Sequence, residues 1–344
     1  MDATRETLLA VYSAADLLRA AEPWQDMSDT DMFAVRNPET GETGYCCIMG
    51  QAGMEFGLFV ATDKEGYGAH LLLADLEEHT SQKRLGLVTW AQKGLVVSFD
   101  NRDEVSPGER KLLKELGLKY RGAKAWTSIR RWDPGLGPWA LEEGQAKYLC
   151  RVIMEALLVH RTFLKTPAKL QEPLAMGDVL VRAPAPGSPD EPWLDTVEPL
   201  PRPPYLPPPD PLPESTMSSL AKLRIIQTTM EVTTPPLQAG IQESSDSRMA
   251  FPRLLLFVEP ARGLVVTYKM LLPGSFPASL SQDVADQILQ LGFAPARLVV
   301  DDPYLHDALR QAFKTLDVQV EFGEFLPTSE EIAETLGRRF RKTD

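Results

Sequence analysis

Cysteine and histidine are scarce in this chain. Its 344 residues include three cysteines and four histidines. Cys46 and Cys47 are adjacent and Cys150 is far away, which is a poor framework for disulfides, so we expect reduced thiols and a cytoplasmic location. The histidines are scattered, and no Cys or His occurs at zinc-binding spacing. These shortages argue against a disulfide-stapled fold and against a zinc site.

Long apolar runs and a surplus of positive charge are also missing. No run approaches the ~18 apolar residues of a membrane-spanning helix, and acids occur too early for a secretory signal, so we expect no membrane attachment. The net charge of −12 argues against a general coat for nucleic acid. No phosphate-binding loop, dinucleotide-binding turn or nucleophile elbow occurs. The common enzyme motifs therefore do not identify an activity.

Proline, by contrast, is concentrated in one place. Residues 184–213 contain 13 prolines, and the wider segment 171–216 has eight acidic and two basic residues. Proline fixes φ and cannot donate to a strand ladder, which favours an extended, semi-rigid acidic connector over 171–216. A ligand for a proline-recognising module is the alternative. The connector divides the chain into a domain at 1–170 and a domain at 217–344.

The domain at 1–170 has mixed helical and strand patterns. Helical periodicity and capping signals predict helices at 5–21, 66–78, 106–118 and 142–164. Short apolar runs predict strands at 32–37, 44–50 and 55–61 and a hairpin over 87–99. We therefore expect an α+β domain.

The domain at 217–344 has a more ordered pattern. A strand at 223–234 and a hairpin around Glu259–Gly263 are followed by a helix at 280–293 and a buried strand at 296–302. A helix at 303–317, a strand at 318–322 and a last helix complete the order. We expect an α/β domain with a mixed sheet flanked by helices, and right-handed crossovers.

This order, with the stretches TTMEVTT, FVEPARGLVVTY and ARLVVDD, resembles the catalytic core of the ribonuclease H-like superfamily, in its integrase and transposase branch. The resemblance implies carboxylates that hold two divalent metals for phosphoryl transfer. At the matching positions stand Glu231, Asp301 or Asp302, and Glu330, Glu331 or Glu334. The first acid is Glu where the superfamily has Asp, and the last helix has acids on several faces. The resemblance therefore implies a degenerate site, with Mg²⁺ or Mn²⁺ only if catalysis survives.

Asp302 has a second interpretation. It precedes Pro303 at the start of a predicted helix, which is a common capping arrangement. The Asp301–Asp302 pair is therefore explained by a helix cap as well as by a metal.

A basic stretch runs from residue 110 to 131, where only Glu115 is acidic. Its eight cations are Arg110, Lys111, Lys114, Lys119, Arg121, Lys124, Arg130 and Arg131. Tyr120, Trp126 and Trp132 are interleaved, and such a pattern can bind nucleic acid through phosphates and stacked bases. Pairing with the acidic connector, or a solvated helix face beside core tryptophans, explains it equally well.

The whole chain also resembles a family of uncharacterised bacterial proteins that pair two domains of unknown function. The resemblance rests on NPETGETGYCCIMG, RRWDPGLGPWALEEGQAKYL and FPRLLLFVEPARGLVVTY. It implies a domain pairing and no activity. From these observations we expect a non-catalytic binding or scaffolding protein without a cofactor. The sequence does not identify its partner, for which a protein and a nucleic acid are the two candidates. The alternative is a metal-dependent nuclease or other phosphoryl-transfer enzyme.

Overall fold

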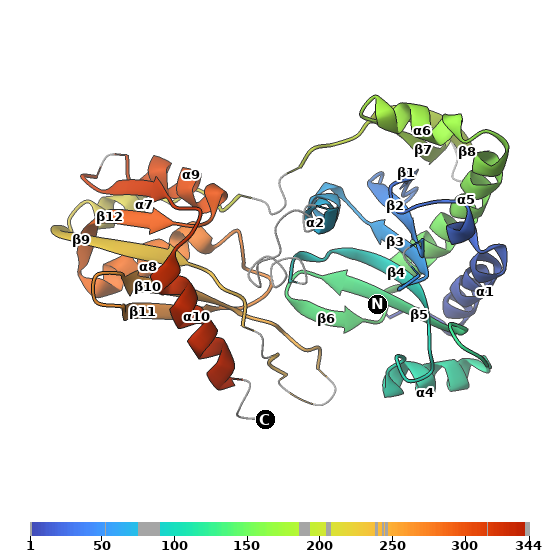
Figure 1. The fold of residues 1–344 in the computed structure, drawn as a ribbon, viewed down its shortest axis with the longest axis horizontal. Coiled ribbons are helices and arrows are strands. Elements are labelled where there is room, and N and C mark those ends of the chain that lie inside the picture. Colours follow the sequence, from blue (N-terminus) through green and yellow to red (C-terminus); the bar gives the residue numbers. More distant parts are fainter. Residues whose placement is uncertain are drawn as a thin grey trace. The chain divides into compact units, whose positions relative to one another are not determined.

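The structure is a computed structural model that describes residues 2–51, 53–74, 90–185, 193–203, 208–237, 240–242, 244, 247–314 and 316–340 (Figure 1). Its contacts divide the chain into two compact units. The first comprises Met1–Leu71, Lys93–Asp133 and Pro138–Pro203. The second comprises Leu72–Gln92, Pro134–Gly137 and Pro204–Asp344. The second unit is therefore discontinuous along the sequence.

An eight-stranded sheet has the order β6-β5-β4-β3-β2-β1-β7-β8, and all of it except the first half of β6 belongs to the first unit. The strands are β1 (Phe33–Arg36), β2 (Thr43–Met49), β3 (Gly57–Ala61), β4 (Gly94–Asp100), β5 (Trp126–Asp133), β6 (Leu136–Trp139), β7 (Asp178–Pro184) and β8 (Trp193–Pro199). From β1 to β5 each strand runs antiparallel to the next, whereas β1 and β7 pair in parallel, so the sheet is mixed.

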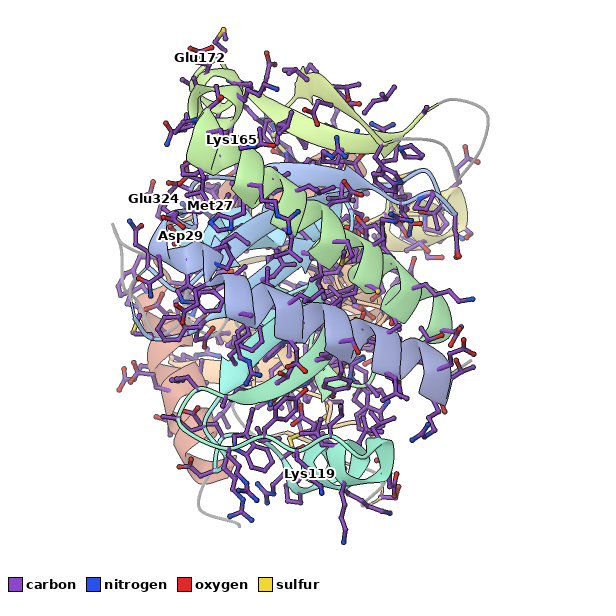
Figure 2. All side chains as sticks on the ribbon, turned by 90° about the vertical axis from the view of Figure 1, so that its right-hand side faces the viewer. Met27, Asp29, Lys119, Lys165, Glu172 and Glu324 are labelled. Atoms are coloured by element: carbon purple, nitrogen blue, oxygen red, sulfur yellow. The ribbon has the colours of Figure 1, made fainter. Side chains whose placement is uncertain are left out.

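Helices cover both faces of this sheet. They are α1 (Arg5–Ala21), the short 3-10 helix η1 (Pro23–Gln25), α2 (Lys64–Ala74), α4 (Pro107–Leu116), α5 (Glu143–Lys165) and α6 (Ala168–Ala175). α1 and α5 run side by side over one face (Figure 2), where their apolar sides bury the larger core cluster. Tyr67 of α2 packs on the other face. Strand alternation places Cys46 in the first cluster and Cys47 in the second, and burial raises the pKa of Cys47 to about 12.

Part of the proline-rich segment is folded rather than extended between domains. β7 and β8 form an antiparallel hairpin, and β7 joins the sheet through β1. This hairpin replaces part of the extended connector expected over 171–216. It can form because its prolines lie at positions where strand pairing tolerates a missing N–H donor. Pro184 and Pro199 end their strands, and β8 is an edge strand with few neighbours to satisfy. The first unit accordingly extends to Pro203.

The second unit contains a five-stranded mixed sheet in the order β11-β10-β9-β12-β13. The strands are β9 (Arg224–Thr233), β10 (Arg253–Glu259), β11 (Leu264–Leu271), β12 (Phe293–Val300) and β13 (Gln319–Phe322). β9, β10 and β11 are antiparallel in turn, whereas β12 runs parallel to both β9 and β13. The carboxyl ends of β9, β12 and β13 therefore lie at one edge of the sheet.

The helices of the second unit are α7 (Glu214–Leu220), α8 (Leu280–Leu291), α9 (Pro303–Ala312) and α10 (Pro327–Phe340). α10 crosses one face of the sheet (Figure 1). Its Ile332 and Leu336 pack there against Leu254 and Leu256 of β10. α8 covers the other face, where Lys269 of β11 pairs with Asp283 at 2.6 Å. A mixed sheet flanked by helices, as expected from the sequence, is thus confirmed. No helix in the described ranges is long and apolar enough to cross a membrane.

Candidate functional site around Arg253

The carboxyl ends of β9 and β12 bring together the residues that follow them. Val300 pairs with Val232, so Asp301 lies beside Thr233. The Thr233 hydroxyl donates a hydrogen bond to Asp301 Oδ2 at 2.5 Å. In sheets with parallel strands, ligand sites commonly occur at this edge. The adjacent acids expected from the sequence are therefore at a position suited to a site.

Asp302 caps helix α9. Its Oδ1 accepts the backbone N–H groups of Tyr304 at 2.9 Å and Leu305 at 2.8 Å, so the cap expected before Pro303 is present. Burial raises the pKa of Asp302, and the charge of Asp301 raises it further. Asp302 is thus a structural acceptor with a costly buried charge.

Arg253 is a buried cation near these two acids. Arg253 is the first residue of β10, and it is only 5 % exposed. Its guanidinium lies 5.4 Å from the ring centroid of Trp90 and 4.7 Å from that of Phe276, which are cation–π distances. Burial lowers the pKa of Arg253 to about 10, and the charges of Asp302 and Asp301 oppose that shift. Arg253 therefore stays charged at neutral pH.

The hydrogen-bonding capacity of Arg253 is only partly used. Nη2 donates to the Thr234 hydroxyl at 3.3 Å. Among the residues that the structure describes, Nε and Nη1 have no hydrogen-bond partner. Buried donors are nearly always satisfied, by protein, water or ligand, so these two solvent-shielded nitrogens call for an acceptor that the described residues do not supply.

Trp90 is held in place by distant parts of the sequence that meet in the second unit. Its Nε1 donates to the Phe251 carbonyl at 2.7 Å, and its ring meets Phe276 edge-on at 4.8 Å. The backbone N–H of Gly135 donates to the Trp90 carbonyl at 2.7 Å. Gly135 has φ of 71°, and a Cβ there would lie 2.6 Å from Trp90 Nε1, so this turn requires glycine.

Arg253, Trp90 and Phe276 are not among the site residues expected from the sequence. Trp90 was expected in a hairpin over 87–99, of which 87–89 lie outside the described residues, and Trp90 itself is helical. One signal was available, because Arg253 stands directly before the apolar run that forms the rest of β10, and a buried charge needs a reason.

Glu231 anchors helix α10. It is 7 % exposed, and its Oε2 accepts the Ser329 backbone N–H at 3.1 Å and the Ser329 hydroxyl at 2.5 Å. On α10 itself, Glu331 and Glu334 are exposed and Glu330 is half-buried. Within the described part of the chain, no group of three His, Cys, Asp or Glu residues is arranged to hold a metal ion. The structure thus brings Asp301 and Asp302 together without gathering Glu231 and the α10 acids around them.

The basic stretch at 110–131 is largely balanced by acids of its own unit. Arg130 pairs with Glu109 at 2.6 Å and with Asp100 at 3.4 Å. The other ion pairs are Arg131 with Glu142 and Asp133, Lys124 with Glu104, and Lys111 with Glu115. Arg110 donates to backbone carbonyls of Arg102 and Val105.

The remaining cations of the stretch, Lys114, Lys119 and Arg121, are exposed, and Figure 2 shows Lys119 just beyond α4. Its aromatic residues are placed differently. Tyr120 is buried in the core cluster, Trp126 packs against that cluster, and Trp132 is half-buried. The aromatic side chains therefore contribute mainly to packing.

Comparison with known families assigns both parts of the chain. Residues 216–337 match a domain of unknown function, DUF6930, and residues 9–182 match a second domain of unknown function, DUF7309. No curated protein matches the chain. The expected pairing of two domains of unknown function is confirmed. The DUF7309 match covers half of the sequence, and the chain therefore belongs to the DUF7309 family.

Proposed function

We propose that this chain is a non-catalytic binding or scaffolding protein whose second unit is a ribonuclease H-like core that has lost catalysis. The strand order β11-β10-β9-β12-β13, with three antiparallel strands followed by parallel β12 and β13, supports the fold assignment. The free thiols of Cys46, Cys47 and Cys150 support a reducing compartment, which we take to be a bacterial cytoplasm.

One observation carries the loss of catalysis. Glu231, Asp301 and Asp302, the carboxylates that would hold metals, each accept hydrogen bonds from their own fold. A metal bound through Oε2 of Glu231 would compete with the hydrogen bonds that anchor buried Ser329 of α10, and leaving such groups unpaired is costly. The acids therefore contribute to folding, and the proposal requires no cofactor.

Arg253 provides the binding capacity at the same edge of the sheet. Its Nε and Nη1 have no hydrogen-bond partner among the described residues, and the rings of Trp90 and Phe276 hold the guanidinium in place. A rigidly held donor loses little conformational entropy on binding, which favours recognition of a partner's carbonyl, carboxylate or phosphate oxygen. That partner is a protein segment or a nucleic acid.

Titration with Mg²⁺ and Mn²⁺ separates this proposal from a metal-dependent nuclease. Metal ions that bind the folded state raise the melting temperature by mass action. We expect the wild type and Asp301→Asn to respond identically to both ions, and neither to cleave labelled DNA or RNA. A metal-dependent rise in melting temperature that Asp301→Asn abolishes, together with cleavage, would establish the nuclease instead.

A further inference from the structure

A surface cavity of about 460 Å³ lies at the carboxyl end of α5 in the first unit, among α5, α6, β7 and β8. The charged side chains that line it are four cations and one acid. The cations are Arg161, Lys165, Lys169 and Arg182, and the acid is Asp195. Figure 2 shows Lys165 at this end of α5. The cavity is positive although the chain as a whole carries a net charge of −12.

The charge of Arg182 is already compensated. It donates to Glu155 at 2.8 Å and to Asp195 at 2.6 Å, and these bonds orient it at the cavity wall. Arg161, Lys165 and Lys169 are exposed, and none of them makes an ion pair with another described residue. The positive charge of the cavity therefore comes from three cations that have no acid of their own, unlike Arg130 and Arg131 in the basic stretch.

A second cavity of about 460 Å³ adjoins the first. The two share Leu158 and Arg161 in their walls. The second lies between α1 and α5, and exposed apolar side chains line it, including Leu17, Met154 and Leu164. Figure 2 looks onto these two helices. An apolar groove thus continues directly into a positively charged cavity.

We propose that this surface binds a small amphiphilic organic phosphate, with its phosphate among Arg161, Lys165 and Lys169 and its apolar part in the groove between α1 and α5. Lysine and arginine are the usual ligands of phosphate groups, and cavities of this size accommodate small molecules. Exposed Leu17, Leu158 and Leu164 would lose water-exposed area when the apolar part binds. The site belongs to the first unit and is independent of the Arg253 site.

Calorimetric titration of the full chain tests the proposal with three probes: octyl phosphate below its micelle concentration, inorganic phosphate, and uncharged octyl glucoside. We expect octyl phosphate to bind more tightly than inorganic phosphate, octyl glucoside not to bind, and added salt to weaken the affinity for octyl phosphate. Equal binding of octyl phosphate and octyl glucoside would overturn the proposal, as would an absence of octyl phosphate binding. Equal affinity for inorganic phosphate and octyl phosphate would overturn the part played by the groove.

Matched variants test the two halves of the surface. The double variant Lys165→Gln, Lys169→Gln should weaken octyl phosphate binding about tenfold or more, because charge-assisted hydrogen bonds are lost. The control is Lys114→Gln, Lys119→Gln, which removes two exposed lysines elsewhere in the same unit. Leu164→Gln should weaken binding of octyl phosphate but not of inorganic phosphate, whereas exposed Met176→Gln should change neither.

A purely structural role for these lysines gives a different result. Lys165 lies in the last turn of α5, where a cation stabilises the helix dipole. If that were its whole role, the lysine variants would lower the melting temperature and leave the octyl phosphate affinity unchanged. That outcome would overturn the proposal.

Discussion

Asp302 combines two effects that oppose each other at neutral pH. Its carboxylate caps α9 through two backbone N–H groups, which stabilises the helix. Its burial raises the pKa, which shows that the charged form is disfavoured where it lies. A neutral side chain with the same capping geometry would keep the first effect and remove the second.

Asp302→Asn is therefore expected to keep the free energy of unfolding within about 0.5 kcal/mol of wild type at pH 7, since Asn caps helices as well as Asp. Asp302→Ala, which removes the cap, should lower it by about 1 kcal/mol. Because the raised pKa lets folded wild type take up a proton more readily than the unfolded chain, acidification from pH 7 toward about pH 4 should favour wild type over the Asn variant. Urea unfolding across this range measures the difference, and a change of the opposite sign would contradict the prediction.

The surroundings of Arg253 could not be predicted from the residues next to it in the sequence. The pattern around it marks a strand, and β10 is that strand. The rings that enclose it come from residues 90 and 276, far away along the chain, so no local pattern reports their approach. Asp302 is the opposite case, because its cap involves only Tyr304 and Leu305 and was predictable from neighbouring residues.

At the scale of elements, helix α10 depends on one buried carboxylate. Glu231 lies on β9 and accepts both the backbone N–H and the hydroxyl of Ser329. Ser329 is fully buried, while the apolar side chains of α10 pack on β10. This bond joins the first strand of the second unit to its last helix.

Ser329→Ala should lower the free energy of unfolding by about 1–3 kcal/mol, because a buried carboxylate loses one hydrogen bond and gains none. Thr328→Ala is the matched control, since Thr328 precedes Ser329 in the same turn and is only half-buried. It should change stability by about 0.5 kcal/mol or less. Denaturant unfolding of the two variants measures this, and equal losses would show that Glu231 does not anchor the helix.

Local sequence pattern predicted whether a segment forms a helix or a strand better than it predicted which strands pair with each other. The helix expected at 106–118 is α4 (Pro107–Leu116), and signals next to it in the sequence mark its ends: Ser106 caps its start, Pro107 opens it and Gly117 ends it. The hairpin of β7 and β8 was missed because its proline content indicates an extended chain. Its pairing with β1 depends on a strand about 145 residues earlier, and no local propensity encodes such pairing.

At the scale of the whole molecule, the two units do not divide the chain at a single point. Residues 72–92 and 134–137 lie within the sequence range of the DUF7309 match but belong by contacts to the second unit. Trp90 and Gly135 are the residues through which these segments hold Phe251. Changes there should therefore affect the second unit.

Gly135→Ala tests this assignment. An alanine at positive φ costs about 1–2 kcal/mol, and here its Cβ would also collide with the Trp90 ring and Pro273. We expect faster amide hydrogen exchange in peptides covering 251–258, with exchange in 44–48 and 94–100 unchanged. Gly263→Ala is the control, because Gly263 has a similar φ of 61° and open space for a Cβ. Its effect should be smaller, and a change confined to strands of the first unit would contradict the assignment.

Although local sequence pattern leaves out β5 to β8 and α6 in the first unit, it specifies the order of elements from β9 to α10, the caps of α4 and α9, and the position of Asp301 and Asp302 at the end of a buried strand. These follow from the spacing of apolar residues and from hydrogen bonds between near neighbours. Three groupings arise only when distant segments fold together: Trp90 and Phe276 enclose Arg253, Glu231 binds Ser329, and the end of α5 forms a positively charged cavity. Such groupings depend on strand register and on the packing of distant segments, which local periodicity does not specify.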